Sequence, residues 1–476
     1  MWGCPGGTAK LWFVSSPSAE PSVTRVAVLL GTLVALTVVG SSAVAVALPE
    51  VARDLHLDKP GTAWIVAVFS LSFSITTAVF GRLADLQGLR RPLRIGVILL
   101  FLGSIAAALA QNFPQLIAAR LVQGAGAGAV PVLALGVLAA RFEGVARGRA
   151  LGALTGVVSI VSGSGPLIGG AITELLGWQY VLAVPAIALL VLEPVARIAP
   201  DAGGVAGRID ARGAALVAAF TTGLILLIQS PATKPGPVLL ALSVVLLLGG
   251  AAALWLHVRR RPNGFLPLRV VANPGVVLSS LAGLTLLAGY LGALLALPQI
   301  LTDEHGWRPL HIGLAIVPAA LVGAVASRVV GGTAQRLGRY RVAAWLALGS
   351  AAGVALAAVW HGTPWLMLIA LAPIVAGFAA GQVALIDGIP QLIDEDVQGV
   401  ALGVFNLVFF TGGAIGSAAV GGLGGAFSLP VALAGLAALP IAGAAASYAI
   451  GRLRRAGLAN AEPGHHGAGD RLHNEA

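Results

Sequence analysis

One acid stands among arginines between two long apolar segments, and this arrangement could hold a protein in one conformation. Residues 81–88 read Gly-Arg-Leu-Ala-Asp-Leu-Gln-Gly, and two more arginines follow at 90 and 91. The carboxylate of Asp85 can form charge-assisted hydrogen bonds with such guanidinium groups, while glycines allow helix ends to approach closely. The sequence therefore predicts a conformational latch made of Gly81, Asp85, Gly88, Arg90 and Arg91. The alternative is a solvated basic loop that happens to contain one acid.

A second candidate is Arg120, which lies a few residues inside another apolar segment, in the run Arg120-Leu-Val-Gln-Gly-Ala-Gly-Ala-Gly128. An ionised side chain in hydrocarbon costs about 2.5 to 3.5 kcal/mol on insertion scales, so it needs a polar partner or water. We predict a functional site at Arg120, Gln123, Gly124 and Gly128. The alternatives are that Arg120 extends to the lipid headgroups or pairs with Glu50.

Motifs that would indicate an enzyme are absent from the sequence. It contains no His-Glu-x-x-His, no Gly-x-Ser-x-Gly and no Walker phosphate loop. The eight histidines fall in expected loops, tails or helix ends, and Cys4 is the one cysteine. Glu193 is an acid within an apolar segment, but Arg197 follows four residues later, which predicts an ion pair. We therefore expect no catalytic residue, no cofactor and no metal.

The elements that must position these residues are membrane-spanning helices. Hydrophobic residues make up 57% of the 476 residues and charged residues 10%, and the mean hydropathy is +0.92, whereas soluble chains average about 25% charged residues. Apolar runs of about 20 residues recur along the chain, and each is long enough to cross a hydrocarbon core. The net charge of +10 is spread over short loops, which argues against a nucleic-acid partner.

Breaking the apolar runs at charge clusters and Pro/Gly turns predicts an all-α integral membrane protein with fourteen transmembrane helices. Their expected ranges are 26–48, 63–80, 95–111, 114–140, 151–172, 180–198, 214–229, 238–257, 275–301, 312–331, 342–360, 364–386, 400–426 and 430–450. Lysine and arginine gather in alternate loops, and those on the opposite side are Arg53, Lys59, Lys234 and Arg308. By the positive-inside rule, both termini of this multi-pass chain are expected in the cytoplasm, at the inner (plasma) membrane.

An internal repeat divides these helices into two halves. Residues 81–88 have a degenerate copy at 331–338, Ala150-Leu-Gly152 recurs at 401–403, and the spacing of glycines 165 and 170 recurs at 416 and 421. The repeat predicts two six-helix bundles with two extra helices inserted between them. The expected parts are a cytoplasmic tail 1–25, an N-terminal bundle 26–198, a linker with the extra helices 199–274, a C-terminal bundle 275–450 and a basic tail 451–476. Duplicated bundles are typical of transporters, which bind substrate near the midplane.

Three motifs together resemble the signatures of the major facilitator superfamily, specifically of its fourteen-helix drug:proton antiporter branch, over roughly residues 26 to 450. The loop from 81 to 91 is similar to the family's first signature, although Leu86 and Leu89 stand where basic residues are usual. The run 120–128 looks like the second. The run Gly-Ser-Gly-Pro-Leu-Ile-Gly-Gly at 163–170 looks like the signature associated with exporters, which assigns an exporter motif to Gly163, Gly165, Pro166, Gly169 and Gly170.

The resemblance implies a monomeric secondary active transporter that exports small, mostly apolar organic compounds, such as drugs or antibiotics, by alternating access. It also implies proton antiport. Many relatives carry an acid in the first helix, in a stretch ending Val-Ala-Leu-Pro, and Gly40 occupies that position here. The alternative is therefore an exporter of an endogenous metabolite without conventional proton coupling.

The substrate should lie between the halves, against the rarer polar and aromatic side chains of the flanking helices. The candidates are Ser41, Ser42, Gln123, Tyr290, Gln299, Gln382, Asn406 and Phe409. Each has the alternative role of packing or hydrogen bonding within its own bundle. Because acids are scarce at membrane level, we expect a substrate that is not strongly cationic. The expected partners are this small molecule, membrane lipid and protons.

Overall fold

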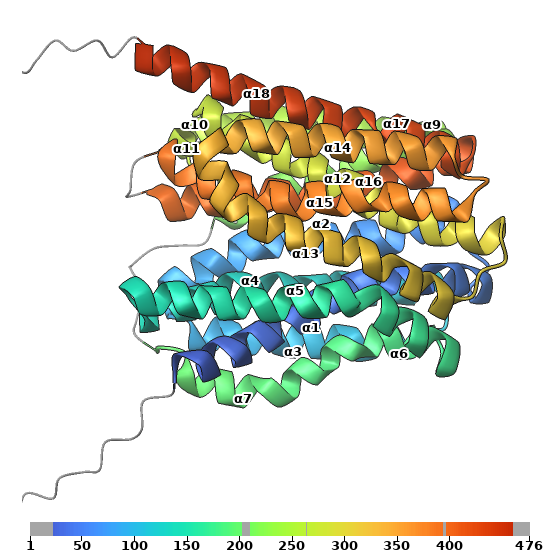
Figure 1. The fold of residues 1–476 in the computed structure, drawn as a ribbon, viewed down its shortest axis with the longest axis horizontal. Helices are drawn as coiled ribbons and strands as arrows, with labels where there is room; N and C mark the ends of the chain where they lie inside the picture. Colours follow the sequence, from blue (N-terminus) through green and yellow to red (C-terminus); the bar gives the residue numbers. More distant parts are fainter. Residues whose placement is uncertain (1–21, 202–209, 263, 394–396, 460–476) are drawn as a thin grey trace, which may run out of the picture.

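The computed structural model describes residues 22–201, 210–262, 264–393 and 397–459, and in these ranges the chain forms helices and no strands (Figure 1). The predicted tails fall almost entirely outside the described residues. The first helices are α1(Val23–Asp54), α2(Lys59–Gln87), α3(Arg90–Ala108), α4(Phe113–Arg141), α5(Gly144–Leu175), α6(Trp178–Ala183), η1(Val184–Ile187) and α7(Ala188–Ile198). Next come α8(Ala211–Thr233), α9(Pro237–Val244), η2(Val245–Gly249), α10(Gly250–Arg260) and α11(Leu268–Val271). The last are α12(Pro274–Asp303), α13(Pro309–Leu337), α14(Arg339–Val359), α15(Pro364–Gly388), η3(Ile389–Gln391), α16(Gln398–Ala426), α17(Leu429–Leu436) and α18(Ala438–Ala459).

Thirteen helical spans among the described residues are long and apolar enough to cross a membrane. The 32-residue helix α5 runs beside them, packed on α1 and α13. The prediction of an all-α membrane protein is confirmed. α1 begins and α18 ends at the same end of the bundle (Figure 1), which we call the termini end. The opposite end, which we call the loop end, carries the turns at 55–58, 109–112, 176–177, 234–236, 304–308, 360–363 and 427–428.

Several helices begin with the same local signal, a capping side chain followed within two residues by proline. The carboxylate of Asp58 accepts from the backbone N–H of Gly61, and the side chains of Asn112 and Asn273 cap α4 and α12 in the same way. Proline in the first turn has a suitable φ and lacks only an N–H that would be unpaired there. These signals explain why the helices begin close to where the sequence predicts.

Some predicted helices are single spans with an internal irregularity. The span 178–198 contains the 3-10 turn η1, where Pro185 has no N–H for an α-helical hydrogen bond. The span 237–260 contains the π-helical turn η2. The last span breaks between α17 and α18, near Pro440. The hydropathy pattern predicts the spans but not these interruptions, because all the segments are equally apolar.

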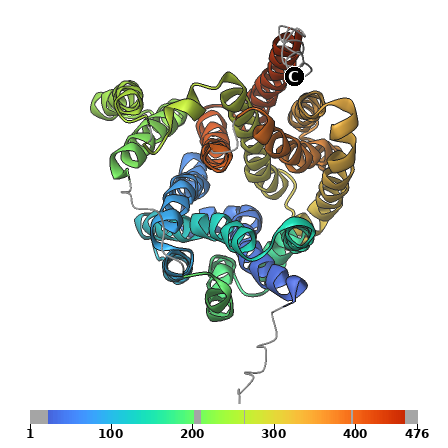
Figure 2. The same cartoon turned by 90° about the vertical axis from the view of Figure 1, so that its left-hand side faces the viewer.

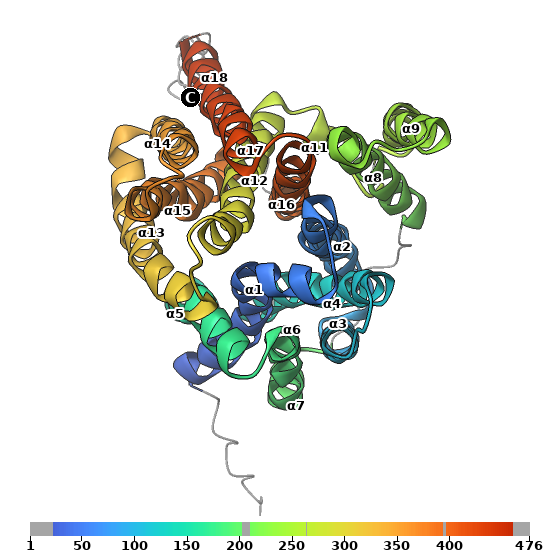
Figure 3. The same ribbon diagram turned by 90° about the vertical axis from the view of Figure 1, so that its right-hand side faces the viewer.

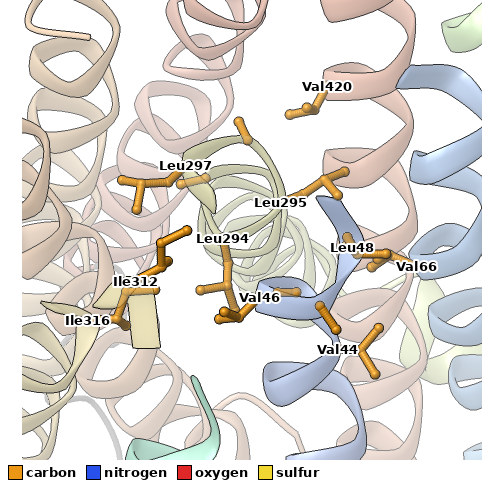
Figure 4. Packing of buried hydrophobic residues seen from close by; sticks show 14 of the residues in the cluster. Val44, Val46, Leu48, Val66, Leu294, Leu295, Leu297, Ile312, Ile316 and Val420 are labelled. Carbon is orange, nitrogen blue, oxygen red and sulfur yellow. The ribbon is translucent and has the colours of Figure 1, made fainter. Parts of the chain in front are cut away.

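The buried apolar side chains form clusters whose membership changes along the bundle. At the loop end a single cluster includes side chains from α1, α12, α13 and α16, among them Val46, Leu295, Ile312 and Val420 (Figure 4). At the termini end there are two clusters, one built from α1–α5 and α7 and the other from α11–α16 and α18. The two groups of helices therefore share a core at the loop end and have separate cores at the termini end.

The inserted helices α8–α10 lie outside both groups (Figures 2 and 3). α8 packs on α16 and also on α2, and a small cluster joins Ile225 of α8 to Ala67 of α2 and Ala414 of α16. Gly422 of α16 faces the backbone of Ile228. The inserted helices thus cover the line along which α2 meets α16.

Candidate functional site

Arg120 is the most deeply buried charged side chain described, at 1% exposure. Its Nε donates to the carbonyl of Ile65 at 3.2 Å, and its Nη1 donates to Oε1 of Gln123 at 2.6 Å. The guanidinium also lies 4.1 Å from the ring centroid of Phe69. A buried cation is tolerated when its donors are satisfied and a π-face lies against it. The structure thus places Arg120 inside the helix group, where these three contacts include no carboxylate.

Gln123 continues this network to two further helices. Its Nε2 donates to Oγ of Ser104 at 2.9 Å and to the carbonyl of Leu182 at 3.0 Å. Gln123 is fully buried and holds Arg120 in position, and its predicted contact with substrate stays a prediction. The network joins α2, α3, α4 and α6.

The proposed pairing of Arg120 with Glu50 does not occur. Glu50 pairs with Arg53 on the same helix, at 2.8 Å. The glycines of the run allow the close packing that buries Arg120: a Cβ on Gly124 or Gly128 would lie under 3.0 Å from backbone atoms of Phe69 or Phe73 on α2. Arg120 and Gln123 therefore belong to a buried network whose partners come from α2, α3 and α6, and the functional role predicted for this helix stays a prediction.

The predicted latch is described only in part. Gly88 ends α2 with a φ of 75°, a conformation that favours glycine. Arg90 pairs with Asp201 at 3.0 Å, and its Nε donates to the carbonyl of Ala196 at 2.9 Å, while Arg91 is exposed. The side chain of Asp85 lies outside the described residues. The role of Asp85 therefore stays a prediction. Arg90, another predicted member of the latch, is bound to the end of α7.

The exporter motif lies where α5 meets two other helices. A Cβ on Gly165 or Gly169 would lie too close to Ser42 or Ala43 of α1. A Cβ on Gly170 would meet the backbone of Pro309 and Leu310 on α13, and Gly313 of α13 faces the carbonyl of Pro166. The surroundings of Gly163 lie outside the described part of the chain. The motif thus permits close contact between the two groups of helices.

An ion pair not predicted from the sequence closes the same contact at the loop end. Oε1 of Glu174, at the end of α5, lies 3.6 Å from Nη1 of Arg308, which precedes α13. Oε2 of Glu174 accepts from the backbone N–H of Leu310 at 3.2 Å. A carboxylate at a helix N-terminus is also favoured by the helix dipole.

Toward the termini end, α5 loses these neighbours. A Cβ on Gly152 or Gly156 would meet no atom within 4 Å, and Ile160 is 72% exposed. Gly403 of α16 likewise faces open space. Together with the two separate cores, these uncovered faces indicate that the groups of helices are joined at the loop end and apart at the termini end.

A row of aromatic side chains crosses from one group to the other near the level where the shared core divides. Its members are Tyr290, Phe378, Phe409, Phe410, Phe73 and Phe69. Tyr290 stacks on Phe378, with ring centroids 4.3 Å apart and an angle of 4° between the planes. The ring centroid of Phe378 lies 6.2 Å from that of Phe409. Phe409 contacts Phe410 edge to face, and Phe410 of α16 lies 4.3 Å from Phe73 of α2. Phe69, next to Phe73, carries Arg120 over its ring.

The aromatic row includes two of the predicted substrate-contacting residues, Tyr290 and Phe409. Phe409 is fully buried, whereas Tyr290, Phe378 and Phe410 are partly exposed. Gln382 and Asn406 are partly exposed on the same helices as Phe378 and Phe410, four residues away in each case, so each amide shares a helix face with an aromatic ring.

Other predicted cavity residues lie elsewhere. Ser42 is buried against Gly165, and its Oγ donates to the carbonyl of Val38. Gln299 is buried toward the loop end, where it donates to the carbonyl of Leu295 on its own helix. The side chain of Ser41 is outside the described residues. Sequence reasoning missed Phe69, Phe73 and Phe378, although the i,i+4 spacing of Phe69 and Phe73, and of Phe405 and Phe409, is a usable signal.

Comparison with known proteins gives a consistent result. The model of the Major Facilitator Superfamily matches residues 29–417 and, in a second match, 279–466. "Multidrug resistance protein Stp" of Mycobacterium tuberculosis is 29% identical over 385 residues, covering 79% of this chain and 71% of that protein. "Lincomycin resistance protein" of Streptomyces lincolnensis is 29% identical over 413 residues, covering 82% of each. "Cephamycin export protein CmcT" of Amycolatopsis lactamdurans is 35% identical over 316 residues, covering 64% of each.

A solved structure shares the fold. It is a bacterial homolog of the human lysosomal transporter Spinster in an inward-facing and unoccupied conformation, with a TM-score of 0.65 and 13% identity, covering 91% of this chain and 98% of that one. The helical architecture, the three motifs and the family match agree. The chain therefore belongs to the major facilitator superfamily and is a multi-pass membrane transporter rather than an enzyme.

Proposed function

We propose that this protein exports small, mostly apolar organic compounds from the cytoplasm by alternating access. The relatives named for multidrug resistance, lincomycin resistance and cephamycin export support drug or antibiotic efflux. The observation that carries the mechanism is the division of one core at the loop end into two at the termini end. A protein joined at one end and separated at the other has the form expected of one access state.

The two moving bodies are the groups α1–α7 and α12–α18. The two groups meet where α5 packs on α13, where α2 packs on α16 and where α1 packs on α12 and α13. The excess of arginine at the termini end supports a cytoplasmic position for that end. In this orientation the present conformation is open to the cytoplasm. Export would then take place across the inner membrane.

The aromatic row supports a planar, uncharged substrate. The partly exposed faces of Tyr290, Phe378 and Phe410 offer stacking surfaces, and the amides of Gln382 and Asn406 beside them offer hydrogen bonds. Stacked aromatic pairs contribute about 0.5 to 1.5 kcal/mol beyond the burial of their area.

Proton antiport is proposed from the family resemblance. The second candidate is an exporter of an endogenous metabolite whose transport is not conventionally coupled to protons. That second candidate is favoured by the surroundings of Gly40. A Cβ at this position would lie 2.5 Å from Cγ of Pro185. The site where relatives carry an acid is therefore filled by packing against η1.

The test is accumulation of a neutral planar aromatic dye in inverted membrane vesicles, with and without an imposed proton gradient. We expect Phe378→Ala to lower the initial rate about tenfold, because a stacking surface is lost. Trp345→Ala is the matched control, since Trp345 is 64% exposed on α14, away from the aromatic row. Equal rates in wild type and Phe378→Ala would remove the row from substrate binding. Export that ignores the proton gradient would favour the second candidate.

A further inference from the structure

An apolar groove lies in the inserted segment, between α8, α10 and α11. It encloses about 450 Å³. Phe220 of α8 forms one wall, Trp255 and Val258 of α10 form another, and Leu268 and Val271 of α11 close it. Arg259 is the charged side chain of this lining. An apolar groove with one cation in its lining has the composition of a lipid-binding surface.

The cation in the groove is held in place by an aromatic ring. The guanidinium carbon of Arg259 lies 3.7 Å from the ring centroid of Trp255. A guanidinium stacked on a ring keeps its N–H donors in its own plane, free to meet a phosphate in the bidentate geometry that arginine favours. Within the described residues, no ion pair of Arg259 is found.

More positive charge surrounds the groove. Arg260 and Arg261 follow Arg259 directly, Arg212 lies in the first turn of α8, and all three are exposed. Arg269 lies on α11. These arginines stand at the termini end, where lipid phosphates of that leaflet would be found.

Asp210, which precedes α8, already has hydrogen-bond partners within the inserted segment. Oδ2 of Asp210 accepts from the backbone N–H of Phe265 at 2.9 Å and lies 2.7 Å from Nε2 of His257, while Oδ1 caps Gly213 at 3.0 Å. Burial alone would raise the pKa of Asp210, but the hydrogen bonds from His257, Phe265 and Gly213 leave this pKa below its ordinary value. Asp210 therefore ties α8 to α10, and its carboxylate oxygens are taken up by His257, Phe265 and Gly213 rather than by Arg259.

We propose that this groove binds one anionic phospholipid, with its phosphate on Arg259 and its acyl chains along Phe220, Val258 and Leu268. The apolar walls explain why the ligand is a lipid rather than a free phosphate. The arginines explain why the headgroup carries net negative charge. Because α8 also covers the line where α2 meets α16, the bound lipid stabilises the inserted helices against the part of the protein that must move.

The test is native mass spectrometry of the detergent-purified protein with phosphatidylglycerol or phosphatidylcholine of equal chain length. We expect wild type to retain phosphatidylglycerol in preference, and Arg259→Gln to reduce that preference about tenfold, since charge-assisted hydrogen bonds to phosphate are lost. Arg452→Gln is the matched control. Arg452 also lies over an aromatic ring, 5.3 Å from Tyr448 on α18, but lies outside this groove.

A second variant tests the apolar wall. Ala251→Phe, on the groove lining, should reduce retention of both lipids, and thermal melting of each variant in detergent checks that it is folded. Equal losses in Arg259→Gln and Arg452→Gln would overturn the site in favour of general surface charge. Absence of headgroup preference in folded wild type would also overturn it. Displacement of the lipid by glycerol phosphate at equal concentration would show an anion site without a role for the groove, which contradicts the proposal.

Discussion

Glu174 at the end of α5 and Arg308 before α13 form an ion pair across the boundary between the two groups of helices, with 3.6 Å between Oε1 and Nη1. The same carboxylate accepts from the backbone N–H of Leu310. Close to it, Gly170 and Gly313 let the backbones of α5 and α13 touch. This pair thus stabilises a closed loop end, opposite to the loop where the sequence predicts a latch.

Glu174→Ala should favour the conformation that is open at the loop end. The side chain of Arg308 is 73% exposed, and exposed ion pairs contribute little, so we expect the ratio of states to change by about twofold to fivefold. The measurement is the labelling rate of a cysteine at Asp303, an exposed position at the end of α12, by an impermeant thiol reagent. Glu50→Ala, which breaks an ion pair within α1 alone, is the control. A labelling rate that rises equally in both variants would contradict a latch at Glu174.

Arg120→Ala should destabilise the protein by about 3 kcal/mol, because the carbonyl of Ile65 and Oε1 of Gln123 would lose a charged donor inside the core. Arg120→Lys should recover part of this lost stability, because lysine keeps the positive charge but lacks the planar guanidinium that donates to two acceptors at once. Thermal unfolding in detergent measures both. Arg94→Gln serves as a control, because Arg94 pairs with Glu193 at an exposed site. A melting temperature for Arg120→Ala equal to that of Arg94→Gln would mean that the buried network is not structural.

Gly169→Ala should reduce stability by about 1 to 3 kcal/mol, because its new methyl group would press on the backbone of Ala43. Gly156→Ala is the matched change on the same helix, and its methyl group would enter open space. That variant should be neutral or slightly more stable. The yield of folded protein and its melting temperature distinguish the two. Equal destabilisation would show that α5 and α1 are not packed as closely as described.

The stability of the inserted helices should depend on pH through Asp210. The hydrogen bonds to Asp210 lower its pKa in the folded protein. Its contribution to the free energy of unfolding is therefore complete above the unfolded pKa of about 4, and it is lost as the pH falls through the lower folded pKa. Asp210→Asn should therefore melt below wild type at pH 7, and the gap should narrow as the pH approaches 3. A constant gap between pH 7 and pH 3 would contradict the ionised carboxylate in this site.

Hydropathy was sufficient to predict the helical spans, since each needs only a long apolar run and a capping signal. Local spacing predicted the pair of Glu193 and Arg197, which is confirmed at 3.4 Å, with Arg94 as an unforeseen third member. The partners of Arg120 come from α2, α3 and α6 and could not be predicted, because they depend on how helices far apart in sequence cross. The pair of Glu174 and Arg308 is missed for the same reason.

The aromatic row depends on tertiary packing in a similar way. Phe73 and Phe410 are more than 300 residues apart and touch only because α2 lies along α16. The predicted role of Asp85 stays a prediction, while the ion pair of its neighbour Arg90 with Asp201 is a finding that no motif suggested.

The most direct test of two rocking bundles is a pair of spin-label distances in the same membrane-reconstituted protein. One pair joins Glu143 and Leu337, at the termini end of α5 and α13, and the other joins Leu176 and Gly362 at the loop end, all at exposed positions. When a transported compound and a gradient are supplied, we expect the first distance to shorten while the second lengthens. If transport proceeds while both distances stay constant, or both lengthen together, the two groups do not alternate about a shared core.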